Sequence, residues 1–541
     1  MKMKLSKIFL AALVAAVAPA MTAGPVIRSI GDSTMATKKL DGQNPERGWG
    51  HMLPGFFSDD VTIDNHAVNG RSTKTFLSEG RWDVVMDSLC PGDYVLIQFG
   101  HNDASNKGER ATVAGGDFDD NLRRYVNDAR SKQAIPVLFT PIARRKFYKD
   151  SLVDTHGKYV QCIKDVAKEL GVVCIDLNKS TTEWIKGLGD EASRQYFMHI
   201  PAGTVPLHPD GRKDNTHLNV AGARIVARMA ADSLAARIPE LSEYVRHYDL
   251  VVAKDGSGDF FSVQDAIDAV PDFRNTRTTV LVCPGVYEEK VVIPQSKRNL
   301  TITGRGDVTV TGDNCASRRN FTGDEYGTNG SATCYIFPDN FTAENITFAN
   351  TAGMTAGQAV ACLTGGDRMF FKNCRFLGCQ DTLFAWGLGR QYYEDCYVEG
   401  SVDFIFGPAL ALFNRCNIHS NRAKGYITAP STPQDAPYGF VFLNCKLTAD
   451  DGVDNCWLSR PWRDYAKTAY INCEIGAHIR PEGWNNWRKP EREKTSFYAE
   501  YGNVGPGAST EKRSFGHVLT SDRGYTPAEI LGDWIPEGSD F

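Results

Sequence analysis

The chain has 541 residues, of which 42% are apolar and 23% charged, and its formal net charge is −5. This composition is ordinary for a globular protein and excludes a disordered chain, a collagen-like repeat and a coiled coil. At roughly 150 residues per domain the length predicts three or four domains, although two large domains are equally allowed. The charge provides no basic surface, so we expect no nucleic-acid partner.

Residues 1–23 have the pattern of a secretory signal peptide. Lysines near the start precede an apolar run from Ile8 to Ala18, and small residues follow it. The run is too short for a stable membrane span, and no later stretch is apolar enough to cross a bilayer. We therefore expect a periplasmic or secreted mature protein. The alternative is a buried N-terminal helix.

Residues 24–240 are predicted to form an α/β domain. Short apolar runs, which predict strands, alternate there with segments whose apolar residues share one helical face. The predicted strands are 26–30, 61–66, 94–99, 135–139 and 172–177, and the predicted helices include 122–129, 159–170 and 219–238. This alternation implies a parallel sheet covered on both sides. An active site is expected at the carboxyl ends of its strands.

Four polar blocks at these strand ends, or at the entry to the last helix, predict a serine esterase. Ser33 follows the first strand, and His217 with Asp214 precedes the last helix. His217 would take the proton of the Ser33 nucleophile while Asp214 orients the imidazole. The N–H groups of Ser33 and Gly70 and the amide of Asn102 would bind the oxyanion. No Gly-x-Ser-x-Gly sequence occurs, which excludes the nucleophile elbow of α/β-hydrolases.

The blocks resemble those of the SGNH (GDSL-like) hydrolases. Within that superfamily the similarity is greatest to the rhamnogalacturonan acetylesterases, over roughly residues 25–240. The segments that carry it are Gly-Asp-Ser-Thr-Met-Ala, Asn-Gly-Arg-Ser, Phe-Gly-His-Asn-Asp and Asp-Asn-Thr-His-Leu. The resemblance implies a three-layer SGNH fold that removes O-acetyl groups from pectic polysaccharide. The alternative within the superfamily is a lipid or acyl-thioester hydrolase.

Residues 248–541 have a different pattern, which predicts a β-solenoid. Short β-branched and aromatic stretches follow one another, and a phrase ending in Cys recurs at intervals of roughly 20 to 30 residues. The phrases are Asn373-Cys374, Asp395-Cys396, Arg415-Cys416, Asn444-Cys445 and Asn472-Cys473. We interpret these cysteines as small buried hydrophobes, and one or two disulfides remain allowed elsewhere. A helical patch at 262–270 would cap the solenoid. The boundary near 239–248 contains no long flexible linker, which allows the two halves to pack together.

Two aspartates in this half are the candidate catalytic pair. Asp381 and Asp403 are 22 residues apart, about one solenoid turn, which would place them side by side on adjacent coils. Neighbouring carboxylates split their pKa values, so one stays ionised while the other holds a proton. Asp403 would attack an ester carbonyl, and Asp381 would protonate the leaving alcohol and then activate water.

Four further residues complete this site. Gln358 and Gln380 would hold the oxyanion, and Arg460 would keep Asp403 ionised and oriented. Trp462 offers a flat face to a sugar ring. Each of the short sequence segments that contain these residues could, taken alone, instead form a turn or an Asn/Gln ladder.

The second set of phrases resembles the pectin methylesterases, from about Tyr248 to the C-terminus. The opening Val-Val-Ala-Lys-Asp-Gly-Ser-Gly and the stretch Pro-Gly-Val-Tyr also match that family. The resemblance implies a right-handed parallel β-helix and a cofactor-free aspartyl esterase that releases methanol from methyl-esterified polygalacturonate. Ser459 replaces a glycine common before Arg-Pro-Trp, and Cys379 replaces an aromatic residue often found before Gln-Asp. Both departures affect the expected subsite preference more than the chemistry.

Together these features predict a secreted bifunctional pectin esterase. Its partner would be methylated and acetylated pectic polysaccharide, and it would need neither cofactor nor metal. One alternative is that the solenoid cleaves the glycan as a lyase or glycosidase, but a lyase would need a Ca²⁺ site with several acidic ligands. Another is a catalytically inactive pectin-binding module that serves the acetylesterase. Separate measurement of methanol release and polymer length distinguishes these readings.

Overall fold

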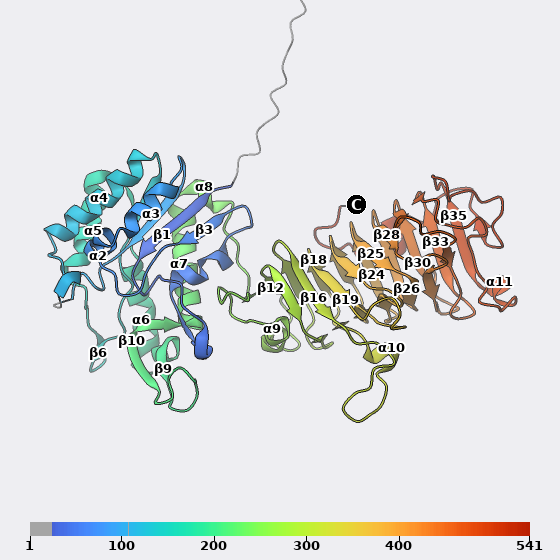
Figure 1. The fold of residues 1–541 in the computed structure, drawn as a ribbon, viewed down its shortest axis with the longest axis horizontal. Coiled ribbons are helices and arrows are strands. Elements are labelled where there is room, and N and C mark those ends of the chain that lie inside the picture. The colour runs from blue at the N-terminus through green and yellow to red at the C-terminus, as the bar shows by residue number, and fades with distance from the viewer. Residues whose placement is uncertain (1–23, 106–107, 541) are drawn as a thin grey trace, which may run out of the picture.

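The structure is a computed structural model and describes residues 24–105 and 108–540. The predicted signal peptide, 1–23, lies outside the described residues. Figure 1 shows an α/β half, in blue to green, beside an elongated stack of strands that runs from yellow-green to red. None of the helices in the described ranges combines the length and apolar character that a bilayer crossing requires.

The α/β half is built on a five-stranded parallel sheet in the order β3-β1-β4-β5-β8. The strands are β1 (Val26–Gly31), β3 (Thr62–Asn65), β4 (Tyr94–Gln98), β5 (Ile135–Phe139) and β8 (Val173–Ile175). They lie where the apolar runs predicted them. β8 ends before the predicted Leu177 because the Asp176 side chain accepts the backbone N–H of Lys179 and starts the next helix.

Helices cover both faces of this sheet, as predicted. One face packs against α2 (Thr73–Ser78), α3 (Arg81–Ser88), α4 (Asp117–Ser131) and α5 (Lys158–Leu170). The other packs against α1 (Trp49–Met52), α6 (Leu177–Ser193), α7 (Val220–Arg237) and α8 (Pro239–Ser242). The short helices η1 (Asp41–Gln43), η2 (Leu53–Phe56), η3 (Gly108–Arg110) and η4 (Arg194–Tyr196) lie in the connections.

A small antiparallel sheet that the sequence analysis did not predict lies beside the main sheet. Its order is β2 (Glu46–Arg47), β10 (Arg212–Asn219) and β9 (Phe197–Ile200). The pair β6 (Phe147–Tyr148) and β7 (Ser151–Leu152) forms a separate hairpin. The second sheet matters for function because β10 carries two of the predicted triad residues.

The second half is a parallel β-helix made of three sheets, in which every named strand pair is parallel. The first sheet has eleven strands, β11 (Leu250–Val252), β12 (Thr278–Val282), β15 (Leu300–Gly304), β18 (Phe341–Glu344), β21 (Met369–Lys372), β24 (Arg390–Glu394), β27 (Leu410–Asn414), β30 (Phe440–Leu443), β33 (Lys467–Ile471), β35 (Phe497–Tyr501) and β36 (His517–Val518). The second has eight, β13 (Gly285–Glu288), β16 (Val308–Gly312), β19 (Thr347–Asn350), β22 (Arg375–Leu377), β25 (Tyr397–Gly400), β28 (Asn417–Ser420), β31 (Lys446–Ala449) and β34 (Glu474–Ile475).

The third sheet carries the predicted aspartates. Its seven strands are β14 (Val291–Ile293), β17 (Cys334–Ile336), β20 (Cys362–Thr364), β23 (Leu383–Ala385), β26 (Val402–Gly407), β29 (Tyr426–Pro430) and β32 (Trp457–Ser459). Helix α9 (Val263–Ala269) caps the start of the β-helix with buried apolar residues, as expected. The remaining helices are α10 (Gly327–Gly330), α11 (Arg492–Thr495) and α12 (Pro527–Leu531).

The cysteine phrases form a ladder inside the β-helix. The five cysteines are at most 2% exposed: Cys374, Cys396, Cys416, Cys445 and Cys473. The residue before each has a left-handed backbone, with φ between 51° and 55°, so each phrase combines a turn residue with an inward-facing thiol. All fourteen cysteines lie in the described ranges and are free, so none of the disulfides allowed elsewhere is present.

The two halves are joined by direct contacts. Arg305 of the β-helix donates to the carbonyl of Pro54 (2.8 Å) and pairs with Asp59 (2.6 Å). Arg224 of α7 donates to the carbonyl of Tyr248 (2.6 Å) and pairs with Asp259 (2.8 Å). The short connection between α8 and β11 therefore joins two halves that are packed together.

Candidate active sites

Ser33, His217 and Asp214 form a hydrogen-bonded chain at the edge of the α/β half. Ser33 follows β1, and His217 lies on β10, 184 residues away. The His217 Nε2 lies 2.9 Å from the Ser33 hydroxyl oxygen, and its Nδ1 lies 2.7 Å from the Asp214 carboxylate. Because a carboxylate only accepts, the imidazole proton belongs on Nδ1, which leaves Nε2 free to accept the serine proton.

Backbone hydrogen bonds within β10 hold the Asp214 carboxylate where it can orient His217. One carboxylate oxygen accepts the backbone N–H groups of Thr216 (2.7 Å) and His217 (3.0 Å). Burial alone would raise the pKa of Asp214, but the hydrogen bond and charge of His217 hold it well below its usual value. The carboxylate therefore stays ionised and oriented toward the imidazole.

The loops with the predicted oxyanion donors are tied to each other and to β1. Gly70 has a φ of 76°, a left-handed conformation that favours glycine. The Asn102 amide donates to the carbonyl of Arg71 (2.9 Å), which joins its loop to that of Gly70. Asp103 accepts the backbone N–H groups of Gly100 (3.1 Å) and Thr73 (3.0 Å), and so anchors the loop of Asn102.

A charged network behind the triad was missed from the sequence. Arg212 lies 2.5 Å from the Asp214 carboxylate and 2.7 Å from that of Glu46. Lys38 lies 2.8 Å from Glu46. The i, i+2 spacing of Arg212 and Asp214 on one strand puts both side chains on the same face, and this was a usable signal. No local pattern indicated Lys38 or Glu46.

The structure also brings together the six residues predicted for the second site. They line one cavity of about 470 Å³: Gln358, Gln380, Asp381, Asp403, Arg460 and Trp462. Gln358 and Gln380 form a parallel bridge between neighbouring coils. Asp381 precedes β23, Asp403 lies on β26 and Arg460 follows β32. The regular stacking of the coils thus aligns residues from the turns of β20, β23, β26 and β32.

The backbone at both aspartates departs from regular strand geometry. Asp381 has a φ of 67° and Asp403 a φ of 50°, both left-handed. The register between β26 and β29 shifts between Val402 and Ile405. Bulges of this kind re-aim a side chain, and strained backbone is often found at functional sites. Here both irregularities coincide with the candidate carboxylates.

The two carboxylates differ in their partners. Arg460 binds both oxygens of Asp403, at 2.7 and 2.6 Å, whereas no cation of residues 24–105 or 108–540 forms an ion pair with Asp381. Burial raises the pKa of Asp403, and Arg460 opposes this rise. Burial, and next the charge of Asp403, raise the pKa of Asp381 well above its usual value. A proton shared by the pair therefore belongs on Asp381.

Two aromatic residues that the sequence analysis missed hold the guanidinium. The Arg460 guanidinium carbon lies 3.8 Å from the centre of the Tyr426 ring and 3.9 Å from that of Trp487. Stacking between two rings stabilises a cation and restricts its orientation. Trp462 packs edge-on against Phe384 and Phe406, so its ring is held in place beside the aspartates.

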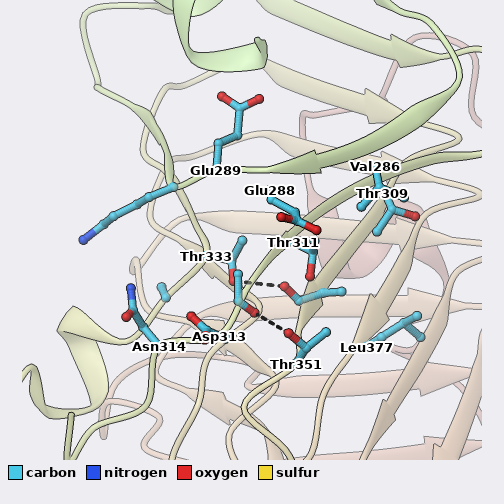
Figure 2. Close-up of a pocket in the computed structure, with 14 residues that line it drawn as sticks. Val286, Glu288, Glu289, Thr309, Thr311, Asp313, Asn314, Thr333, Thr351 and Leu377 are labelled. Atoms are coloured by element: carbon cyan, nitrogen blue, oxygen red, sulfur yellow. Dashed lines mark hydrogen bonds between the residues drawn. The ribbon is translucent and has the colours of Figure 1, made fainter. Parts of the chain in front are cut away.

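A larger groove of about 800 Å³ lies over β13, β16 and β19 (Figure 2). Its polar groups serve the fold: the Glu289 carboxylate accepts the backbone N–H groups of Val263 (2.8 Å) and Gln264 (2.9 Å). Thr333 and Thr351 donate to backbone carbonyls, at 2.9 and 3.1 Å (Figure 2). None of the predicted site residues, all of which are described, lines this groove.

Among the described residues, Glu394, Asp395 and Asp540 form the one acidic group close enough to share a metal ion. Arg415 lies 3.0 Å from Glu394 and 2.9 Å from Asp395, and Lys372 lies 3.0 Å from Asp540. The two cations offset most of the charge of the three carboxylates, and these ion pairs attach the C-terminal segment to the β-helix.

Comparison with known families agrees with the assignment of the two halves. A family model described as Pectinesterase matches residues 249–523, more than half of the chain. The chain belongs to the pectinesterase family. A second model, described as GDSL-like Lipase/Acylhydrolase family, matches residues 29–225. Both families are carboxylic ester hydrolases, so the recognition of the two halves from their motifs is confirmed.

Individual relatives match the pectinesterase half. Pectinesterase 31 from Arabidopsis thaliana is 42% identical over 270 residues, which are 48% of this chain and 84% of the relative. Probable pectinesterase 8 from the same plant is 38% identical over 302 residues, 52% of this chain and 74% of the relative. The solved structure of the pectin methylesterase from carrot is 33% identical, covers 53% of this chain and 93% of its own, and gives a TM-score of 0.49.

Proposed function

We propose that this pectinesterase is bifunctional: its β-helix half removes methyl esters from polygalacturonate, and its α/β half removes O-acetyl groups from pectic polysaccharide. The observation that carries the proposal is that each half has a complete nucleophile and acid–base group of its own. In one half these are Ser33 and His217, 2.9 Å apart. In the other they are Asp403, bound by Arg460, and Asp381 in the same cavity.

In the β-helix half, the ionised Asp403 attacks the carbonyl carbon of the methyl ester. Asp381 gives its proton to the departing methoxide, which leaves as methanol. The resulting carboxylate takes a proton from water, which attacks the acyl intermediate and releases Asp403 and the free uronate. Gln358 and Gln380 donate to the oxyanion, and Trp462 supports a sugar ring.

In the α/β half, the Ser33 oxygen attacks the acetyl carbonyl while His217 takes its proton. His217 then protonates the sugar oxygen, which leaves as an alcohol, and the acetyl group stays on Ser33. Water, deprotonated by His217, releases acetate. The N–H groups of Ser33 and Gly70 and the Asn102 amide would stabilise the oxyanion.

The setting of the enzyme belongs to the same proposal. The pattern of residues 1–23 supports export to the periplasm or the medium. Pectic polysaccharide that carries both methyl and acetyl esters would be the substrate there. The O-acetyl substrate of Ser33 is proposed from the resemblance of the polar blocks to those of the rhamnogalacturonan acetylesterases.

The test is to treat natural pectin with the intact protein and quantify methanol and acetate separately, together with polymer length. We expect both products and an unchanged chain length. Methanol without acetate would contradict the role proposed for the α/β half. Shortening of the polymer would instead indicate a glycan-cleaving β-helix.

A further inference from the structure

Lys38 occupies the space directly behind the esterase nucleophile. It is 5% exposed, and its ammonium group has three acceptors. These are the Ser33 carbonyl (2.5 Å), the Asn69 side-chain oxygen (2.6 Å) and the Glu46 carboxylate (2.8 Å). Because an ammonium has three N–H bonds, every donor is satisfied. Lys38 thus ties the turn of the nucleophile to the loop that carries Gly70.

Glu46 extends this tie to the other end of the triad. Its second oxygen lies 2.7 Å from Arg212, which in turn lies 2.5 Å from Asp214. Burial would raise the pKa of Glu46, but Lys38 lowers it below its usual value, so the carboxylate is charged. Removing one member of such a buried network leaves an uncompensated charge. The chain Lys38–Glu46–Arg212 therefore fixes the nucleophile turn relative to the orienting aspartate.

The segment that carries Lys38 and Glu46 is held by the β-helix half. Arg47, which is 2% exposed, donates to the carbonyl of Gly256 at 2.9 Å. The His51 Nδ1 accepts the backbone N–H of Lys38 (3.4 Å), and its Nε2 lies 3.1 Å from the carbonyl of Asp255. A neutral imidazole with its proton on Nε2 satisfies both contacts, and burial lowers the pKa of His51, which favours that neutral form.

The approach of the two halves at this point is close. Gly256 has a φ of 79°, and a Cβ added there would lie 2.6 Å from the side chain of Leu40 and 3.1 Å from that of Arg47. A larger residue at 256 would therefore push against the segment between Lys38 and Arg47.

We propose that the Asp255-Gly256 turn of the β-helix braces the esterase site, by holding through Arg47 and His51 the segment whose Lys38 and Glu46 position Ser33 and Asp214. This inference rests on the proposed function of the α/β half. Lys38, Glu46, Arg212 and Arg47 are positioning residues, since none contacts the reacting atoms. The two halves would then be independent in chemistry but not in geometry.

The first test replaces Lys38 by Met, with Lys39→Met as the matched control, because Lys39 is the exposed neighbour. Hydrolysis of p-nitrophenyl acetate is measured so that polymer binding plays no part. For Lys38→Met we expect kcat to fall about 10- to 100-fold with KM nearly unchanged, because displacement of a reacting group by about 1 Å can cost 100-fold. Lys38→Arg should recover part of the loss, and Lys39→Met should match wild type.

The second test removes the contact of Arg47 with the β-helix half. Arg47→Ala should lower the same kcat about tenfold, by the same loss of positioning, while methanol release from pectin stays at the wild-type rate. Arg47 also donates to the carbonyls of Asn44 (2.7 Å) and Glu46 (2.8 Å) within its own segment. The control is Arg305→Ala, which removes contacts between the halves at Pro54 and Asp59 rather than at the triad segment. We expect Arg305→Ala to leave kcat unchanged. Retained methanol release shows that the β-helix half of each variant is folded, and circular dichroism checks the α/β half.

The possible outcomes distinguish failure of the proposed brace from failure of the proposed esterase function. If Ser33→Ala keeps wild-type hydrolysis, the proposed esterase site itself is wrong. If Ser33→Ala is inactive but Lys38→Met and Arg47→Ala keep the wild-type kcat, the brace is wrong and the triad stands. An equal loss in Arg47→Ala and Arg305→Ala would also overturn the brace, since general loosening of the interface would explain both.

Discussion

In the α/β half the hydrogen-bonded pair Ser33 and His217 is separated by 184 residues, whereas in the β-helix half Asp381 and Asp403 are 22 residues apart. The first site gathers loops at the edge of a sheet, so each residue depends on a separate connection. The second site uses equivalent positions on stacked coils, so the repeat itself aligns the residues. A site of the first kind needs additional ties to hold its loops, and Lys38, Glu46 and Arg212 provide them. The site on the β-helix needs fewer such contacts between loops, and the irregular backbone at its two aspartates orients their side chains.

Ser33→Ala is expected to have the largest effect, and it tests whether the two sites are chemically separate. Acetate release should fall by about 10⁴-fold or more, because loss of a triad nucleophile leaves only oxyanion and binding effects. Methanol release should be unchanged on pectin whose acetyl groups were first removed chemically. On natural pectin it should slow modestly, because uncleared acetyl groups obstruct the polymer. A collapse of methanol release on the deacetylated substrate would contradict the two-site interpretation.

Asp403→Asn tests the candidate site of the β-helix half. Methanol release should fall by about 10³-fold or more, because an amide cannot form the acyl intermediate, while acetate release stays near wild type. The matched control is Asp395→Asn, since Asp395 also has a left-handed backbone (φ 53°) and binds an arginine, Arg415, at 2.9 Å. The control should retain methanol release. Substantial release by Asp403→Asn would mean that the nucleophile lies elsewhere.

The pH dependence of Arg460→Ala tests whether Arg460 keeps Asp403 ionised in the aspartate pair. We expect methanol release to fall about 100-fold, because Arg460 orients Asp403. Removing the guanidinium also removes the influence that opposes burial, so the pKa of Asp403 should rise further. Since the proposed mechanism requires ionised Asp403, the acid limb of the pH–rate profile should move to higher pH, by about one unit or more.

The control for this variant is Arg480→Ala. Arg480 stacks on Trp457 at 3.9 Å in the same half but is not among the residues that line the cavity. Its pH–rate profile should match wild type. An unshifted profile for Arg460→Ala would remove Arg460 from the role of keeping Asp403 ionised.

Cys396→Ala should have the smallest effect, and it addresses the repeat rather than the chemistry. Loss of a buried sulfur from the ladder should lower the free energy of unfolding by about 1 kcal/mol, because a small cavity replaces it. Urea denaturation followed by loss of methanol-releasing activity measures this in the β-helix half. Cys90→Ala, at an exposed cysteine of the α/β half, should leave stability unchanged. Equal stability of the two variants would mean that the ladder does not contribute to packing.

Much of this architecture was predictable because it depends on local sequence patterns. Apolar runs predicted all five strands of the parallel sheet to within one or two residues at most ends. The recurring phrase that ends in Cys predicted the coils, since a turn residue and a buried thiol are both local requirements. Asp381 and Asp403 were found from their spacing of about one coil, the other four residues of the second cavity from polar residues within apolar phrases, and Ser33, Asp214 and His217 from blocks at strand ends.

The rest depended on contacts between distant segments, for which the sequence carries no local signal. The small sheet was missed because β2 has only two residues and pairs with β10 across 171 to 173 residues, and because the sequence of β10 is mostly polar and has no apolar run. The Tyr426 and Trp487 rings were missed because only the stacking of coils brings them to Arg460. The left-handed backbone of Asp381 and Asp403 likewise belongs to the folded coil.

The sequence by itself determined the two families, the strands of the sheet and coils, and the chemical groups at each site. The tertiary structure alone decided how those groups are held. Lys38 is an ordinary lysine in the sequence, and it becomes a positioning residue only because burial forces each of its N–H bonds to find an acceptor. Arg47 and Gly256 lie 209 residues apart and belong to different halves. Their contact exists because the two halves pack together, and packing of that range has no periodicity along the chain to predict it.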